Sequence, residues 1–249
     1  MTNSELDLLE TIDVEFLRKL LNAPRGTPKE MLFLELGCIP LREIIRERRL
    51  GFLHYILNED EESMVNKFFK SQLKNRTKKD WVNSVLDDLE SLGLAYLSWD
   101  QIRSMKKGIF MNLVKEKIEV KAFENLQKKN KSHSKVKQLN HNAIKMQKYL
   151  QANQTNIKRE EAQLIFKLRC KVTEVKVNLK GSYDYLECGA CGLEEESQKH
   201  IIQCEKLNQI KRTEEINYDK LFDGTVLEKL KIAKVFKENL KLLDQIKKG

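Results

Sequence analysis

Four residues near the C-terminal end have the types and the spacing of a metal-ligand set. Cys188, Cys191, His200 and Cys204 follow the pattern C-x2-C-x8-H-x3-C. A Cys-x2-Cys turn brings two thiolates to one ion, and residues four apart on a helix share one face. Three thiolates and one imidazole select zinc over magnesium or calcium. Because four protein ligands complete a tetrahedron, the spacing predicts a structural zinc ion, not a catalytic one.

The residues around this set fit a zinc knuckle. Gly192 directly follows the second thiol and permits the positive φ that such turns require. Ser197 is a suitable N-cap for a helix with His200 in its first turn. The alternative is a pair of buried free thiols beside an unrelated histidine, and four compatible spacings disfavour it. The two remaining cysteines, Cys38 and Cys170, are interpreted as reduced core thiols.

Positive charge is concentrated in residues 103–137. This segment has eleven basic and three acidic residues, so it contains eight of the chain's nine excess positive charges. A solvated helix face is the alternative, but such faces usually mix the two signs. The segment therefore predicts a surface that faces a polyanion, formed by Arg103, Lys106, Lys107, Lys115, Lys117, Lys121, Lys128, Lys129, Lys131, Lys135 and Lys137.

A second basic face is expected on the helix that follows Pro40. Arg42, Arg46 and Arg49 recur on one side of it and could bind phosphates through charge-assisted hydrogen bonds. Glu43 and Glu47 interrupt this face and weaken the prediction.

Other residues that could do chemistry have structural interpretations. Asp87 and Asp88 lie in a segment of helical period, which indicates a surface helix and not the β-hairpin that carries polymerase carboxylates. His54 lacks a partner nucleophile or carboxylate nearby in the sequence and is interpreted as a packed or half-exposed helical residue. His133 and His141 flank the basic segment and are expected to be solvated.

The composition predicts an all-α protein. The chain has 249 residues with only 3 prolines and 10 glycines, too few for a many-stranded barrel or sandwich. An apolar stripe runs from Leu6 to Leu20, and further helices are expected at 31–36, 41–57, 61–74, 79–92, 99–105, 106–128, 138–150, 158–176 and 225–247.

Four regions are expected. They are a helical region at 1–128, a basic linker with helices at 129–180, a zinc knuckle at 181–210 and a C-terminal amphipathic helix at 211–249. No apolar run approaches the ~18–20 residues that span a bilayer. The five cysteines do not suggest a disulfide framework, so an intracellular, non-secreted protein is expected, nuclear or cytoplasmic.

Residues 20–57 resemble the segment after the polymerase palm in non-LTR retrotransposon reverse transcriptases, closest to the Dong/R4 and R2-like branch. The thumb-region pattern of that family is matched by Glu35, Gly37, Pro40, Arg42, Ile45, Arg48, Arg49 and Leu53. The Cys188–Cys204 set is similar to the C-terminal CCHC knuckle of the same proteins, in the same order. The resemblance covers roughly residues 5–210.

The resemblance implies a nucleic-acid-handling module that holds an RNA–DNA or DNA duplex, or element RNA, in the context of a retroelement polyprotein. Fingers, palm and catalytic aspartates would lie before residue 1, so the isolated chain is expected to lack polymerase and nuclease activity. A zinc-stabilised protein-interaction module is the alternative, with the basic segment binding an acidic partner. An enzyme whose site is not apparent is disfavoured because no carboxylate constellation is visible.

Overall fold

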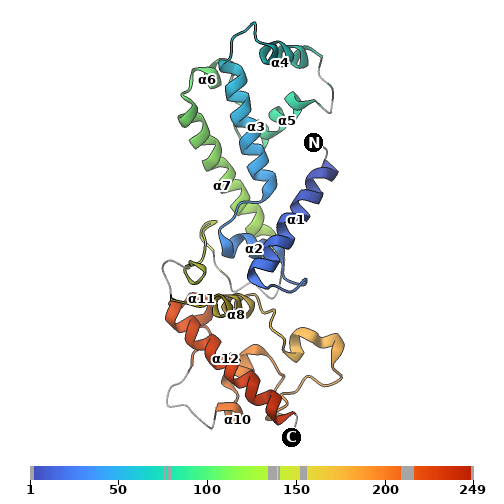
Figure 1. Cartoon of the computed structure of the whole chain (residues 1–249), viewed down its shortest axis with the longest axis vertical. Coiled ribbons are helices and arrows are strands. Elements are labelled where there is room, and N and C mark those ends of the chain that lie inside the picture. Colours follow the sequence, from blue (N-terminus) through green and yellow to red (C-terminus); the bar gives the residue numbers. More distant parts are fainter. Residues whose placement is uncertain are drawn as a thin grey trace. The chain divides into compact units, whose positions relative to one another are not determined.

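The computed structural model describes residues 3–75, 77, 80–133, 139, 141–151, 156–208 and 216–247. This part of the chain is all-α, as predicted, with no β-strand and one isolated antiparallel bridge between Glu187 and Glu195 (Figure 1). The α-helices are α1 (Asn3–Leu21), α2 (Lys29–Leu36), α3 (Leu41–Asn58), α4 (Met64–Lys74), α5 (Trp81–Ser91), α6 (Trp99–Ser104), α7 (Lys107–Ser132), α8 (Arg159–Arg169), α9 (Gln198–Gln203), α10 (Glu205–Asn208), α11 (Lys220–Asp223) and α12 (Val226–Ile246).

The chain divides into two compact units. Unit 1 comprises Met1–Asp13 and Ile39–Leu126, and unit 2 comprises Val14–Cys38 and Gln127–Gly249. Helices α1 and α7 therefore contribute residues to both units. No helix in the described ranges combines the length and the apolar character needed to cross a membrane.

The core of unit 1 is formed where α3 packs against α4, α5 and α6, with α7 beside them. Leu50 and Leu53 of α3 and Phe110 of α7 are fully buried in it. His54 is packed in this core, as predicted: its Nε2 lies 2.8 Å from the Met105 carbonyl oxygen, and its ring stacks on Phe110. This packing fixes the orientation of α3 and leaves one of its sides exposed.

In unit 2, α12 packs along α8 and α9. Their shared core includes Phe166 and Leu168 of α8, Ile201 of α9 and Phe236 of α12, all almost completely buried. Because α9 also carries His200, this packing attaches the predicted knuckle to the longest helix of the unit.

A buried ionic cluster in unit 2 contains a histidine that was expected to be solvated. The Glu35 carboxylate is fully buried, and the Arg169 guanidinium binds it with Nη2 at 2.9 Å from Oε1. His141 Nε2 lies 2.9 Å from the same oxygen, and the Tyr149 hydroxyl donates to Oε2. The prediction that His141 is solvated was therefore wrong, since its side chain is only 2% exposed.

The predicted helix at 138–150 was also wrong, because its described residues 141–147 are not helical and only Lys148–Leu150 forms a short 3-10 turn. Tertiary contacts hold this stretch instead: Gln147 N–H donates to the Glu35 carbonyl oxygen at 2.9 Å. The backbone of this stretch passes so close to Gly37 that a Cβ atom on residue 37 would lie 2.0 Å from the backbone nitrogen of Met146. Gly37 also has a φ of +67°, so both geometry and space require glycine. The predicted helix at 158–176 ends early, at Arg169.

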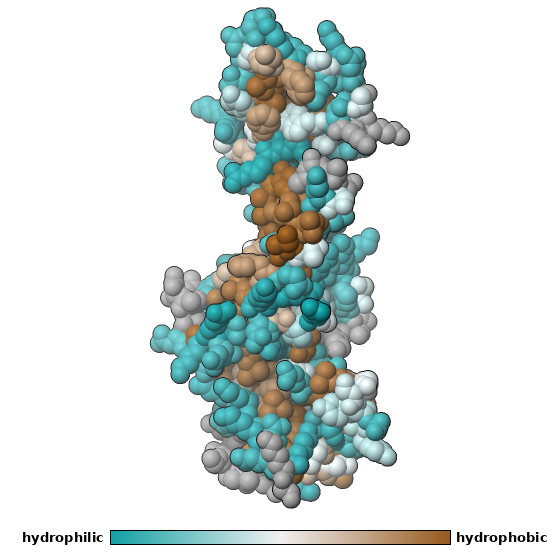
Figure 2. All heavy atoms as spheres, turned by 45° about the vertical axis from the view of Figure 1, so that its right-hand side comes forward, coloured by the Kyte–Doolittle hydropathy of each residue, from teal (hydrophilic) through white to brown (hydrophobic). Residues whose placement is uncertain are grey.

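Apolar side chains remain on the surface between hydrophilic ones (Figure 2). On α1, the predicted stripe is only partly buried: Leu6 and Leu17 are inside, whereas Ile12 is 58% and Phe16 63% exposed.

Candidate metal centre

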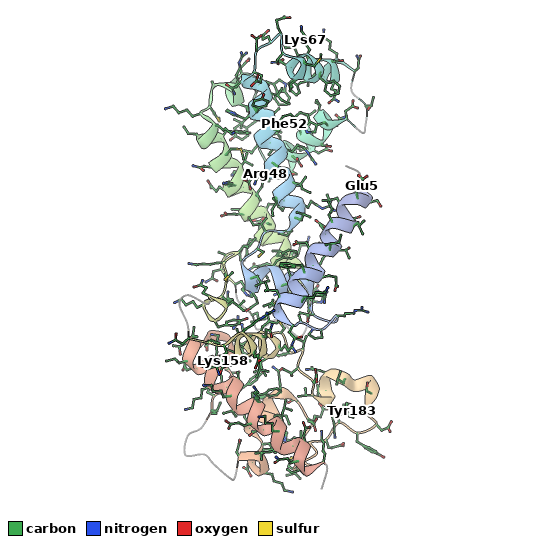
Figure 3. All side chains as sticks on the ribbon, in the orientation of Figure 1. Glu5, Arg48, Phe52, Lys67, Lys158 and Tyr183 are labelled. Atoms are coloured by element: carbon green, nitrogen blue, oxygen red, sulfur yellow. The ribbon has the colours of Figure 1, made fainter. Side chains whose placement is uncertain are left out.

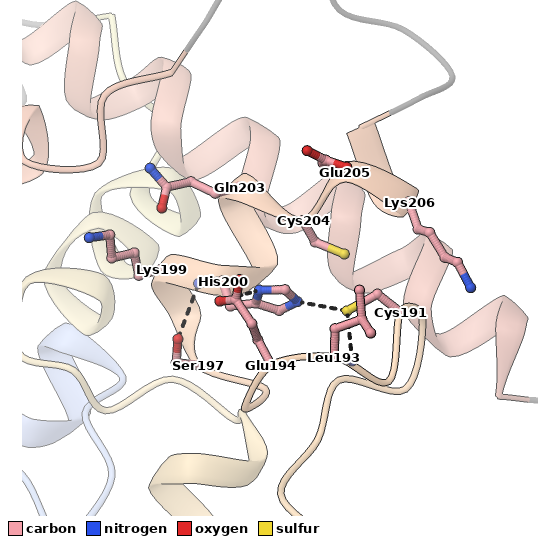
Figure 4. A pocket seen from close by; sticks show the side chains of 10 residues that line it. All are labelled: Cys191, Leu193, Glu194, Ser197, Lys199, His200, Gln203, Cys204, Glu205 and Lys206. Carbon is pink, nitrogen blue, oxygen red and sulfur yellow. Dashed lines mark hydrogen bonds and ion pairs between the residues drawn. The ribbon is translucent and has the colours of Figure 1, made fainter.

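The four predicted ligands come together in unit 2. One donor atom from each of Cys188, Cys191, His200 and Cys204 lies within 4.8 Å of every other. The Cys191 sulfur is 3.3 Å from His200 Nε2, close to the edge of about 3.6 Å expected for thiolate and imidazole on one tetrahedral ion. Cys188 and Cys204 are buried, and Cys191 is half-buried. These four residues could hold a metal ion. Figure 4 shows Cys191, His200 and Cys204 side by side.

Short-range backbone contacts position the two thiols of the turn. Cys188 N–H donates to the Glu194 carbonyl oxygen at 2.7 Å, and Gly192 N–H donates to the Cys188 carbonyl oxygen at 2.8 Å. Gly192 has a φ of +67°, as predicted. Residues 186–196 therefore form a short hairpin, and its backbone hydrogen bonds hold the sulfurs of Cys188 and Cys191 close together.

Helix α9 supplies the other two ligands. The Ser197 hydroxyl accepts a hydrogen bond from the His200 N–H at 3.1 Å, so the predicted N-cap is confirmed. Cys204 is the C-cap of the same helix, and its N–H donates to the His200 carbonyl oxygen. One helical turn thus separates the imidazole from the third thiol and places both over the hairpin.

Two contacts attach the centre to α12 and to its C-cap residue, Lys247. Asn239 of α12 donates to the Ile201 carbonyl oxygen at 2.7 Å. Glu196, which is buried next to the hairpin, binds Lys247 Nζ at 3.1 Å. The centre is therefore part of the core of unit 2, and part of its structure is held without the metal ligands.

The local surroundings affect the thiols unequally. Burial raises the pKa of Cys191, but N–H groups of Leu193 and Glu194 and the His200 side chain outweigh it and lower that pKa to about 7. Burial and the neighbouring sulfurs of Cys188 and Cys191 raise the pKa of Cys204 to about 11. Crowded thiols of this kind resist joint ionisation unless a cation compensates their charge.

Glu194 is a residue that the sequence analysis missed. Its Oε2 lies 3.1 Å from His200 Nδ1, and its side chain is 73% exposed. A carboxylate on the second nitrogen fixes the imidazole tautomer and leaves Nε2 free to bind a metal. The spacing of Glu194 in the sequence does not indicate this role. Its position in the folded hairpin, which faces α9, does.

We expect Glu194→Ala to weaken metal binding by about tenfold, the lower end for a partner of this kind because the carboxylate is exposed. Competition with a chromophoric chelator measures the affinity. Glu195→Ala is the matched control, since Glu195 is also exposed and its loss changes the charge equally. Equal effects of the two substitutions would show that only the charge matters.

The predicted arginines on α3 form ion pairs within unit 1. Arg42 binds Asp7 and Glu10 of α1 at 2.8 and 3.2 Å. Arg46 and Arg49 bind the two oxygens of Asp88 at 3.0 and 2.8 Å. Asp87 and Asp88 lie on helix α5, as predicted, but the expected surface position was wrong for Asp88, because its side chain is only 8% exposed. Asp87 is exposed, as expected.

The predicted basic segment is mostly exposed. Arg103 and Lys115 form long ion pairs, both of 3.7 Å, with Glu61 and Glu47 respectively. Lys121 is half-buried and donates to the Ser91 carbonyl oxygen. The remaining described side chains are exposed and form no ion pair with other described residues: Lys106, Lys107, Lys117, Lys128 and Lys129. The side chain of Lys131 and the whole of Lys135 and Lys137 lie outside the described residues.

The sequence analysis also left Arg48 out of the basic face of α3. Arg48 is exposed and has no ion pair among the described residues. Its helical spacing from Phe52 and Tyr55 was the signal that could have identified it.

The assignment of these sites rests on their own geometry, because no protein-family model, curated protein or solved structure matches the chain.

Proposed function

We propose that this protein binds nucleic acid through the phosphate backbone, with the lysines of α7 as its main contacts. The observation that carries this proposal is the set of exposed lysines of unit 1 that form no ion pair with other described residues: Lys106, directly before α7, and Lys107 and Lys117 within it. A lysine that already pairs with a carboxylate gains little from a phosphate, whereas an unpaired one releases condensed counterions when it binds.

The arginines of α3 have a smaller part in this proposal. Arg46 and Arg49 together neutralise the buried Asp88 carboxylate, so moving either of them to a phosphate would remove one of the two partners of that charge. Contacts to the backbone favour recognition of shape and charge over sequence.

Zinc is the metal that the donor set favours. Three thiolates and one imidazole are soft ligands, and four protein ligands leave no position for a substrate or a reactive water. In this proposal the ion has a structural role: it holds the hairpin of Cys188 and Cys191 against α9.

The sequence resemblance suggests the biological setting. The protein would be the thumb-like and knuckle region of a retroelement reverse transcriptase, holding template–primer or element RNA. No polymerase or nuclease activity is proposed for the chain. Asp88, one of the two adjacent carboxylates, is bound by two arginines, which disfavours a role in binding catalytic metals.

Charge reversal of α7 tests the proposal. We expect Lys106→Glu, Lys107→Glu and Lys117→Glu together to weaken binding to duplexes of any sequence. Log affinity should fall linearly with log salt in the wild type, and the slope should flatten by about 0.9 for each lysine that contacts a phosphate of duplex DNA. Fluorescence anisotropy across a salt series measures both quantities.

The matched control reverses three exposed lysines of α12, namely Lys231, Lys237 and Lys241. Acidic residues such as Glu238 and Asp244 on the same helix offset their charge, so a smaller loss is expected. Equal losses in the two triple variants would show that only net charge matters. Binding of an acidic protein without salt-dependent binding of nucleic acid would favour the interaction-module alternative.

A further inference from the structure

One side of α3 presents an arginine and two aromatic rings to solvent. Ile44, Arg48, Phe52 and Tyr55 recur at spacings of four, four and three residues, so they lie on one face of the helix. Phe52 and Tyr55 are each 46% exposed, and Ile44 is 40% exposed. Figure 3 shows Arg48 and Phe52 one turn apart on α3.

The two rings form a rigid platform. Their centroids are 5.8 Å apart and their planes differ by 16°, which is an offset stack. An edge-to-face contact with Trp81, at a ring-centroid distance of 5.6 Å, restrains the Phe52 ring. Trp81 in turn contacts Phe69, which is 96% buried, so the platform is anchored in the core of unit 1.

Charge is distributed unequally along this face. Arg48 is exposed and has no ion pair among the described residues. Lys115, which is 53% exposed, forms a long ion pair of 3.7 Å with Glu47, the residue before Arg48. At the other end the Tyr55 hydroxyl forms a hydrogen bond with Glu59. The Arg48 end is therefore suited to an anion, whereas the Glu59 end is not.

The geometry points to a stacking site for an unpaired base of single-stranded nucleic acid, with its phosphate toward Arg48. This inference rests on the proposed function and adds to it a contact to bases. Flat aromatic surfaces stack on any base, and an adjacent arginine supplies the charge that a phosphate requires. Bases within a duplex do not expose their faces, so the site selects unpaired strands. Because Arg48 forms no ion pair with other described residues, this occupant is favoured over an apolar protein surface, which would bury that charge without a partner.

Two oligonucleotides of equal length separate stacking from charge. One is oligo(dT), and the other has the same backbone but is abasic. We expect Tyr55→Leu, which keeps an apolar side chain but removes the flat ring, to weaken oligo(dT) binding on the order of 5- to 100-fold. Binding of the abasic strand should not change. Tyr96→Leu is the matched control, because Tyr96 is 69% exposed and its loss should affect neither strand.

Arg48→Gln should weaken both strands and reduce the salt slope by about 0.7, the value for one phosphate contact on a single strand. An equal effect of Tyr55→Leu on both strands, or no effect beyond that of Tyr96→Leu, would overturn the inference. If duplex binding through α7 persists in that case, the proposed function survives. A wild type that binds neither strand nor any duplex overturns both proposals.

Discussion

Cys191→Ser should release the metal ion and unfold the hairpin around it, the largest local effect expected in this protein. Zinc contributes about 10–16 kcal/mol of apparent binding free energy in small structural sites of this type. Serine replaces a thiolate by a hard, poorly ionised hydroxyl, so the tetrahedron loses a ligand. Elemental analysis should give about one zinc per wild-type chain and a background level in the variant.

The unfolding should be confined to part of unit 2. With the proposed zinc ion in place, the hairpin at 186–196 would depend on it, whereas α9 is also held by Asn239 and by the buried Ile201. Hydrogen exchange should therefore increase more in the hairpin than in α9 or α12, and most of the helical circular dichroism should remain. Cys38→Ser is the control, since Cys38 is outside the ligand set. Stoichiometric zinc in Cys191→Ser would refute the ligand assignment.

The part of the site that could be predicted from sequence depends on short separations. The spacing of the thiols, the glycine at 192 and the cap at Ser197 all act within a few residues, and the structure has the four side chains together. The helices with strong apolar periodicity were likewise predictable, because one buried face is enough to define them.

The errors arise where partners are distant in sequence. His141 is 106 residues from Glu35, and Arg49 is 39 residues from Asp88. A periodic pattern identifies a polar face but not whether that face meets a carboxylate on another helix. The stretch at 141–147 has helical composition, yet its contacts with Glu35 and Gly37 outweigh a weak local propensity.

The second large effect is expected from Arg169→Met, which removes the cation of the buried cluster in unit 2. Arg169 contacts both oxygens of Glu35 and donates from Nη1 to the Leu221 and Phe222 carbonyl oxygens. Methionine fills a similar volume but leaves the Glu35 charge without its main partner. Breaking a buried pair in this way costs about 3–5 kcal/mol. Chemical denaturation should show the loss in the transition that reports on unit 2.

Arg42→Met provides the matched control. It is the same substitution in a partly exposed arginine, whose partners Asp7 and Glu10 are 68% and 24% exposed. Ion pairs of that kind contribute about 0–1 kcal/mol. A similar loss in both variants would mean that the burial of the Glu35 cluster has no special energetic consequence.

The dependence on pH separates charge from packing in this cluster. Burial raises the pKa of Glu35, but Arg169 and the hydrogen bond from His141 outweigh it and lower the pKa to about 2, below the ordinary 4.5. The folded-state pKa is thus below the unfolded one, so this stabilisation is present above pH 4.5 and is lost as the pH falls toward 2. Without Arg169, burial favours the neutral acid, and protonation relieves the unpaired charge. The stability difference between wild type and Arg169→Met should therefore shrink as the pH falls, first through the raised pKa of Glu35 in the variant and then toward 2 as the wild type loses its own stabilisation. A difference that stays constant with pH would attribute the loss to packing alone.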